Sequence, residues 1–296
     1  MNHSAPDANA IPEDWKITWP LFWVGALSAL LLLGGWLPAI KFFPLPAHYL
    51  PFHTSLEFVA MAVSAMVFSL AWNLRSAPGN SHAVILGSGF LTVTLIDLAH
   101  TLSFPGMPDL VTASGTEKAI SFWLAGRFVA AAVLLAVAVR SARHWSSLQS
   151  HLALLAALVF SAVVWWVGIF HREWLPRTFI PGEGLTAFKV GAEYLLALVY
   201  ALAALLLYRN GVAAQRHDRL WLAAAAWVLG LAELFFTLYA DVTDIFNLLG
   251  HVYKGIAYIM IYRALFVAGV RSPYRDWPPN AAICKPCCRP FPTWSG

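Results

Sequence analysis

Long, uninterrupted apolar runs are the feature that most constrains how this chain can fold. An α-helix needs about 20 apolar residues to cross the hydrocarbon core of a bilayer. Eight runs of that kind follow one another: Ile17–Ile40, Leu50–Leu74, Ala83–Phe104, Ala119–Arg140, His151–Phe170, Phe188–Tyr208, Leu220–Asp241 and Asn247–Val270. Their apolar residues are continuous, whereas the strands of a transmembrane barrel alternate. The runs therefore predict an all-α, polytopic transmembrane helical bundle of about eight spans, with seven possible if the first run does not cross.

The composition of the chain is that of a membrane protein. Hydrophobic residues make up 59% of the chain and charged residues 11%, which is roughly half the charged share of a soluble domain. We expect residues 1–16 to be a cytoplasmic N-terminal segment and residues 17–271 to form the membrane-spanning domain. Residues 272–296 are rich in proline and lack helical periodicity, so we expect a cytoplasmic, disordered tail.

Arginines are concentrated in alternate loops. Those that follow the second, fourth and sixth runs are Arg75, Arg140, Arg143, Arg209, Arg216 and Arg219. Because positive loops favour the cytoplasm, this pattern predicts that both termini are cytoplasmic. The same rule explains the net charge of +4 without nucleic-acid binding. With this orientation, most ionisable residues of the runs fall in the outer half of the bundle.

Two pairs of ionisable residues in neighbouring runs point to a binding site. His53 and Glu57 are four residues apart, and Asp97 and His100 are three apart, so each pair shares one helix face. His251 in the last run lies at the same predicted depth. Three imidazoles and two carboxylates are a ligand set suited to zinc, iron, manganese or copper. The pattern predicts a site for a divalent transition metal at these five residues, with haem less expected.

A purely structural interpretation also fits these residues. Buried acids could hold Arg127, Lys189 or Lys254 in charge pairs that fix helix packing, or form a network that responds to protons. Arg127 and Glu193 are expected as partners of the site and not as metal ligands, since arginine keeps its proton and cannot coordinate.

Two other functions are compatible with intramembrane acids. Zinc hydrolases of the ceramidase and adiponectin-receptor type resemble this chain in using helix-borne histidines with an aspartate. Their pair of histidines four apart on a late helix is missing, because Gly255 lies four residues after His251. An intramembrane metal-dependent hydrolase of lipid amides or esters is nevertheless the alternative function. A transporter ranks last because we find no inverted repeat and no matching pair of broken spans.

Four stretches resemble the membrane-associated sensor (MASE) domains of the third type. They are HTSLEF at 53–58, LIDLAHTLSFPGM at 95–107, FWLAGR at 122–127 and NLLGHVYKGIAYIMIYRALF at 247–266. The resemblance runs from about Leu50 to Arg275, and its most specific element is DLxHTLSxPGM. The polar positions that match the motifs are His53, Glu57, Asp97, His100, Arg127 and His251.

The resemblance implies a sensory input module in the bacterial inner membrane. Members of that family are joined to cytoplasmic outputs such as histidine kinases and diguanylate cyclases. The expected partners are therefore the lipid bilayer, a second copy in a homodimer and, in relatives, a cytoplasmic signalling output module. No output domain follows Arg275 in this sequence. We accordingly expect no catalytic residues and no enzymatic activity.

Overall fold

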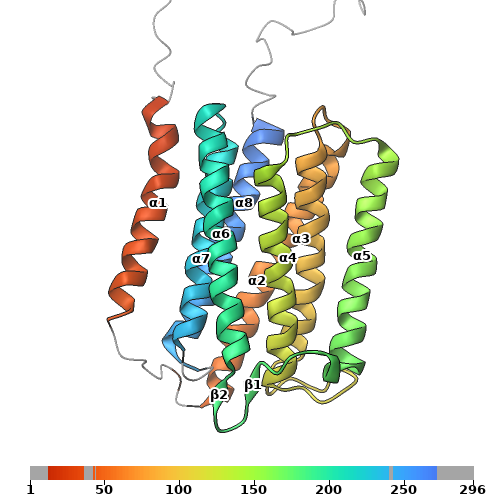
Figure 1. Cartoon of the computed structure of the whole chain (residues 1–296), viewed down its shortest axis with the longest axis vertical. Coiled ribbons are helices and arrows are strands. Elements are labelled where there is room, and N and C mark those ends of the chain that lie inside the picture. Colours follow the sequence, from red (N-terminus) through yellow and green to blue (C-terminus); the bar gives the residue numbers. More distant parts are fainter. Residues whose placement is uncertain (1–12, 37–42, 44, 240–242, 272–296) are drawn as a thin grey trace, which may run out of the picture.

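Eight α-helices stand side by side in the described part of the chain (Figure 1). The computed structural model describes residues 13–36, 43, 45–239 and 243–271. The helices are α1 (Glu13–Gly34), α2 (Pro46–Asn73), α3 (Ser81–Leu102), α4 (Thr116–Val139), α5 (Ser147–Phe170), α6 (Ala187–Ala213), α7 (His217–Leu238) and α8 (Ile245–Phe266). The N-terminal residues 1–12 and the predicted tail 272–296 lie outside the described residues.

The predicted fold class is confirmed. Seven helices, α2 to α8, are long and apolar enough to cross a membrane. The described apolar part of α1, Trp19–Gly34, is shorter than the other seven. Helices suit a bilayer because lipid offers the backbone no hydrogen-bond partners, so each N–H and C=O must be satisfied within the segment.

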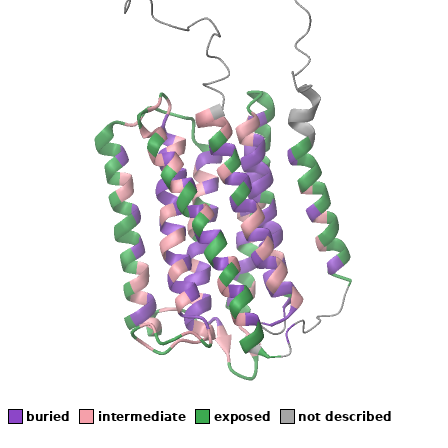
Figure 2. Cartoon of the chain, turned by 180° about the vertical axis from the view of Figure 1, so that it is seen from behind, coloured by how far each residue is buried: buried purple, intermediate pink, exposed green. Residues whose placement is uncertain are grey.

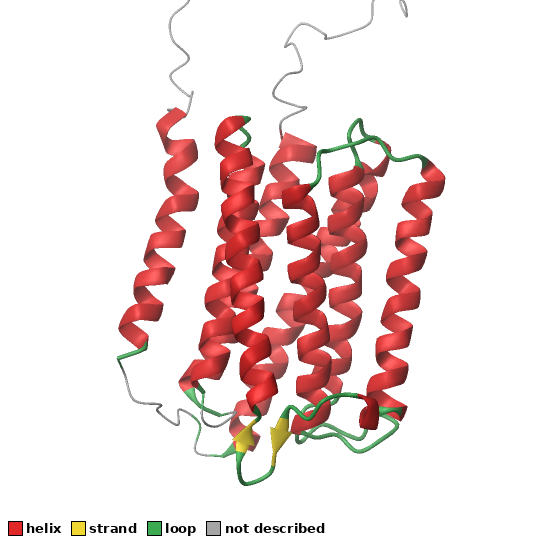
Figure 3. Cartoon of the chain, viewed as in Figure 1, coloured by secondary structure: helices red, strands yellow, loops and turns green. Residues whose placement is uncertain are grey.

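Polar residues at the helix ends provide the remaining backbone partners. Ser146 begins α5 with a capping box that it forms with Gln149. The Asp244 side chain accepts hydrogen bonds from the backbone N–H groups of Phe246 and Asn247 at the start of α8. Between α5 and α6 the chain forms a short hairpin of β1 (Phe179–Ile180) and β2 (Gly184–Leu185), visible at one end of the bundle in Figure 3.

The interior of the bundle is built around α7. In the most apolar 18-residue window of each helix, 83% of α7 is buried but only 22% of α5. Figure 2 shows the same contrast, with α1 and α5 largely exposed at opposite edges of the bundle. The exposed positions of α5 are apolar, for example Leu152, Leu155 and Phe160. A surface of this kind is stable in contact with lipid chains and not with water.

The topology brings the candidate residues to one level. Helices α2 and α8 begin, and α3 ends, at the end of the bundle that carries the β1–β2 hairpin (Figure 1). His53 lies near the start of α2, His100 near the end of α3 and His251 near the start of α8. The antiparallel order of these helices therefore assembles residues that are far apart in the sequence.

Close packing of α7 and α8 yields a first prediction. A Cβ at Gly250 would overlap the ring of Phe236, which is 3% exposed and held between Trp123 and His251. We expect Gly250→Ala to lower the free energy of unfolding by about 1–3 kcal/mol. Unfolding of the detergent-solubilised protein by a denaturing detergent would measure the change.

Gly255 provides a matched control on the same helix. No atom lies within 4 Å of a Cβ built there. Gly255→Ala should raise the free energy of unfolding by up to about 1 kcal/mol, because alanine is the better helix former. Equal effects of the two substitutions would contradict the packing described for α7 and α8.

Candidate functional site

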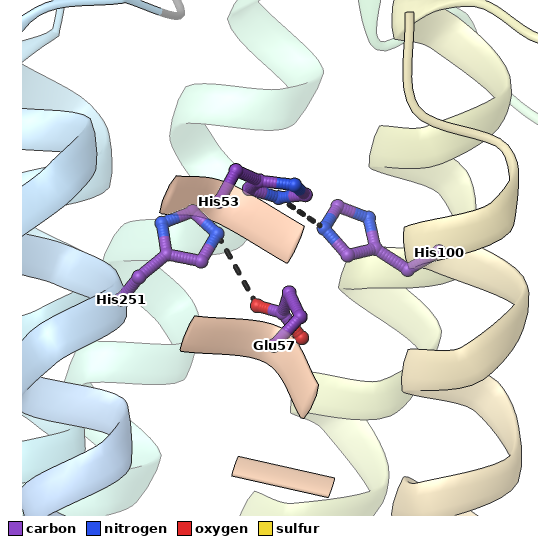
Figure 4. Close-up of side chains that lie close together, drawn as sticks. All are labelled: His53, Glu57, His100 and His251. Atoms are coloured by element: carbon purple, nitrogen blue, oxygen red, sulfur yellow. Dashed lines mark hydrogen bonds and ion pairs between the residues drawn. The ribbon is translucent and has the colours of Figure 1, made fainter. Parts of the chain in front are cut away.

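Four buried side chains from three helices converge near one end of the bundle. His53 and Glu57 come from α2, His100 from α3 and His251 from α8, and Figure 4 shows them turned toward one another. Each offers one potential ligand atom, and these four atoms all lie within 4.8 Å of one another. Exposure of the four residues ranges from 0% to 5%, so water does not compete freely for them. The predicted grouping of these four residues is thus present in the fold.

Backbone carbonyls hold two of the imidazoles in a defined orientation. His100 Nδ1 lies 2.8 Å from the carbonyl oxygen of Ala119 on α4, and His251 Nδ1 lies 2.7 Å from that of Asn247. A carbonyl only accepts hydrogen bonds, so each Nδ1 carries the proton and donates it. The Nε2 atoms are left unprotonated: that of His100 accepts a hydrogen bond from His53 Nε2, and that of His251 has no hydrogen-bond partner among the described residues. Histidines that bind metals are typically held in this way.

The third imidazole is fixed by packing. The His53 ring stacks on Phe104 with 3.9 Å between ring centroids, and its Nε2 lies 3.3 Å from His100 Nε2. Within the described residues, His53 Nδ1 has no hydrogen-bond partner. A buried polar atom without a partner costs roughly 1–3 kcal/mol. This unpaired nitrogen and the unpaired Nε2 of His251 indicate a place where a ligand would satisfy groups that the described residues leave unsatisfied.

Glu57 is held by a lysine and lies beside a histidine. The Lys254 ammonium lies 2.6 Å from each carboxylate oxygen of Glu57, and His251 Nε2 lies 3.3 Å from Oε1. Lys254 follows His251 by three residues, so both project from the same face of α8. Lys254 therefore contacts both oxygens of the carboxylate that a metal would need as a ligand. The sequence predicts Lys254 only as a general charge partner, although its spacing from His251 is a signal for a place in this site.

Asp97 does not belong to the converging group. Both of its oxygens lie 3.0 Å from Arg127 Nη2, and Lys254 Nζ lies 3.3 Å from Oδ2. Arg127 also donates a hydrogen bond to the hydroxyl of Tyr258. Asp97, which was predicted as a metal ligand, thus lies in a charge network beside the cluster, and Arg127 occupies the partner position that was expected for it. Glu193 does not reach this site, because it pairs with Lys189.

The charged groups of the site balance one another. Glu57 and Asp97 face Lys254 and Arg127, and all four residues are at most 1% exposed. Pairing is required because an isolated charge in a medium of low dielectric constant is strongly destabilising. These contacts support the structural interpretation for Asp97 and Arg127. They do not account for three imidazoles placed beside them.

Trp123 forms a wall of the site that the sequence analysis did not identify. Its ring centroid lies 5.3 Å from that of His251 and 5.4 Å from that of His100. The Arg127 guanidinium lies over the same ring at 4.6 Å, a favourable cation–π contact. Trp123 precedes Arg127 by four residues on α4, so a shared helix face was the available signal.

The free space beside the histidines is small. A pocket lined by His53, His100, His251 and Trp123, among others, has a volume of about 30 Å³. That volume corresponds to about one water molecule. A hydrolase of lipid amides or esters needs room for its substrate next to the metal, and this pocket does not supply it.

Comparison with known protein families identifies a match. A family model described as MASE3, a membrane-associated sensor domain, matches residues 45–273 of the 296. The match includes α2 to α8 and all the candidate residues. No curated protein and no solved structure matches the chain.

The buried charge network leads to a second prediction. Arg127→Met would leave Asp97 with Lys254 as its remaining cationic partner, and Lys254 also serves Glu57. Removing one member of a buried pair typically costs about 3–5 kcal/mol, so we expect a loss of that size in the free energy of unfolding.

Arg172→Met is the matched control. Arg172 pairs with Glu117 at 3.0 Å, but the two side chains are 37% and 30% exposed. An exposed pair contributes about 0–1 kcal/mol, so little change is expected. A loss at Arg127 no greater than at Arg172 would show that the buried network does not stabilise the bundle.

Proposed function

Because the chain belongs to the MASE3 family of membrane-associated sensor domains, we propose that it is the sensory input part of a bacterial signalling system that responds to a metal. The site is the cluster of His53, Glu57, His100 and His251, and the ligand is a divalent transition metal: zinc, iron or copper. The observation that carries the proposal is the pair of carbonyl-anchored histidines, whose unprotonated Nε2 atoms face the other two ligand groups.

The donor set fits this class of ion. Neutral imidazole nitrogens with one carboxylate oxygen bind zinc, iron and copper, whereas magnesium and calcium prefer oxygen ligands. In a tetrahedral site with bonds of about 2.0–2.2 Å, ligand atoms lie about 3.3–3.6 Å apart. The four atoms here are separated by up to 4.8 Å. Metal binding would therefore draw α2, α3 and α8 closer together.

A sensor needs two states, and the contact of Lys254 with Glu57 defines the metal-free one. Without metal, the Lys254 ammonium holds Glu57 by two short contacts. A metal bound to Glu57 would repel this ammonium at close range, and Lys254 would have to withdraw toward Asp97. A ligand shifts a conformational equilibrium only through different affinities for the two states, and the exchange of Lys254 for metal provides that difference.

Helix α8 is the element that would transmit the change. It carries His251 and Lys254 near its start, and after Phe266 it continues into a π-helical turn, Val267–Arg271. We propose a multi-pass protein of the inner membrane with both termini cytoplasmic, so that the end of α8 meets the cytoplasmic output. A shift of α8 on metal binding would reach that output directly, in a homodimer if the outputs work in pairs.

Metal content is the first test of this function. Purified full-length protein, loaded with Zn²⁺ and dialysed, should retain about one ion per chain by elemental analysis. His100→Ala should reduce that content by more than half, because it removes one of four ligands and leaves an incomplete site. His82→Ala is the control, since His82 lies at the opposite end of α3 and contacts the Arg140 carbonyl.

The proposal would be contradicted if wild type and His100→Ala retained equally little metal after loading with zinc, iron or copper. Loss of metal in both His100→Ala and His82→Ala would indicate unfolding, which circular dichroism of the same samples would detect. With Cu²⁺, electron paramagnetic resonance of the wild type should in addition show coordination by imidazole nitrogen. The His82→Ala variant should keep the same signal.

Lys254 leads to a further test. Lys254→Met removes the competing ammonium and one positive charge from beside the site, so the dissociation constant for Zn²⁺ should fall by roughly tenfold or more. Lys118→Met is the control: Lys118 is also buried, but it donates to the carbonyls of Leu110 and Thr112 and makes no contact with Glu57. Weaker metal binding in Lys254→Met than in Lys118→Met would rule out competition between lysine and metal.

A further inference from the structure

A larger cavity lies at the end of the bundle opposite the β1–β2 hairpin. Helices α2, α4, α6 and α8 end there, and α3 and α7 begin there (Figure 1). The cavity has a volume of about 260 Å³. That volume is close to the lower limit, about 300 Å³, of pockets that hold small molecules. The cavity shares no lining residue with the pocket beside the histidines, so it is a separate feature of the fold.

The start of α7 contributes charged side chains to this cavity. Arg216, Asp218 and Arg219 line it. The Arg216 guanidinium holds both oxygens of Asp218, with Nε 2.8 Å from Oδ1 and Nη2 2.7 Å from Oδ2. Within the described part of the chain, no hydrogen bond or ion pair satisfies the guanidinium of Arg219, which is half-buried. The cavity is therefore lined by one cation whose charge is not balanced.

The other polar side chains of the lining already have partners. His82 Nε2 lies 3.0 Å from the carbonyl oxygen of Arg140. The Asn80 side chain accepts a hydrogen bond from the backbone N–H of Trp145 and donates one to its carbonyl. These contacts fix the loops around the cavity. They leave Arg219 as the charged group of the described lining that a ligand would satisfy.

Most of the remaining lining is apolar. The cavity reaches into the bundle as far as Leu86 of α3 and Val137 of α4, which are both 1% exposed. Leu265 and Ala268, at the end of α8 and in the turn after it, complete this apolar part. An unbalanced cation next to apolar walls is the lining expected for a ligand that is anionic at one end and apolar at the other.

The charge of the surrounding loops favours an anion. Among the described residues 74–82, 138–151 and 205–220, the only acidic residue is Asp218. The same segments carry six arginines: Arg75, Arg140, Arg143, Arg209, Arg216 and Arg219. Such a surplus raises the local concentration of anions. Membrane orientation accounts for positive loops, but it does not account for a cavity beside an unpaired guanidinium.

We propose that this cavity binds the phosphate group of an anionic amphiphile, with Arg219 as its principal partner. A guanidinium presents its N–H groups in a planar fork that matches phosphate oxygens. A phospholipid of the surrounding bilayer supplies both a phosphate and an apolar part, which would contact Leu86, Val137 and Leu265. The site is independent of the His/Glu cluster, because it is made of different residues at the other end of the bundle.

A ligand in this cavity would act on the end of α8. Ala264, Leu265, Ala268 and Gly269 all line the cavity. Gly269 lies so close to the α2–α3 connection that a Cβ added there would overlap Leu74. A bound phosphate compound would therefore fill the space between α7 and the end of α8 and hold that end in place. Helix α8 would then receive a second signal at the end opposite to His251.

Thermal unfolding of the full-length protein in detergent at constant ionic strength tests the proposal. A ligand that binds only the folded state raises the thermal midpoint. Dioleoylphosphatidylglycerol should raise it, and dioleoylglycerol, which lacks the phosphate, should not. A rise with the phospholipid alone would assign the site to a membrane lipid, whereas a rise with inorganic phosphate as well would show that a soluble phosphate compound can also occupy it. No rise with either phosphate-bearing probe would overturn the proposal.

Two substitutions with a matched control locate the site. Arg219→Gln should raise the dissociation constant for phosphatidylglycerol about tenfold or more, because a charge-assisted hydrogen bond is lost. Arg209→Gln removes the same charge from the same end of the bundle, but Arg209 is exposed and does not line the cavity. Its dissociation constant should stay within about twofold of wild type, because exposed charges are screened by salt.

Ala268→Leu tests the cavity without changing any charge. The larger side chain would occupy part of the space next to α8, so phosphatidylglycerol should bind more weakly than to wild type. The thermal midpoints of the ligand-free variants report whether each one folds. Equal weakening in Arg219→Gln and Arg209→Gln, or wild-type affinity in Ala268→Leu, would overturn the proposal.

Discussion

The requirement that buried charge be neutralised organises the interior of this bundle. Lipid gives no solvation to an ionised side chain, so every charge must find a partner within the protein. Arg127, Asp97, Lys254 and Glu57 form a continuous chain of ion pairs that crosses from α4 through α3 and α8 to α2. These contacts fix the relative positions of four helices. The three histidines are oriented against this rigid frame.

The contact between Lys254 and Glu57 connects the structural and the sensory interpretations. In the structure, the charged side chains of the site form a neutral set of ion pairs that needs no metal. The imidazoles beside it nevertheless direct their Nε2 atoms toward Glu57 and toward one another. A site whose carboxylate is held by an internal cation is suited to switching, because an external cation can replace the internal one. A site built only for stability would not require His53, whose Nδ1 lacks a partner within the described residues.

Residue spacing predicted much of the fold and of the candidate site. The apolar runs predicted the helical bundle, and the i, i+4 and i, i+3 spacings placed His53 with Glu57 and Asp97 with His100 on common faces. Loop charge suggested that the pairs share one depth, and the structure brings His53, Glu57, His100 and His251 together. The spacings did not reveal that Asp97 turns to Arg127, because face and depth do not fix which neighbour a side chain meets. Whether the cluster binds a metal stays a prediction.

The sequence by itself determined the membrane-spanning helical class, the family and the set of polar residues, since these depend on local composition, periodicity and short motifs. Only the tertiary structure decided how the acids are partitioned. It assigned Asp97 to Arg127, Glu57 to Lys254, and Glu193 to Lys189. The physical reason is that a charge pair depends on distances of a few ångströms between different helices. Such distances follow from how the helices pack and rotate, which no single stretch of sequence encodes.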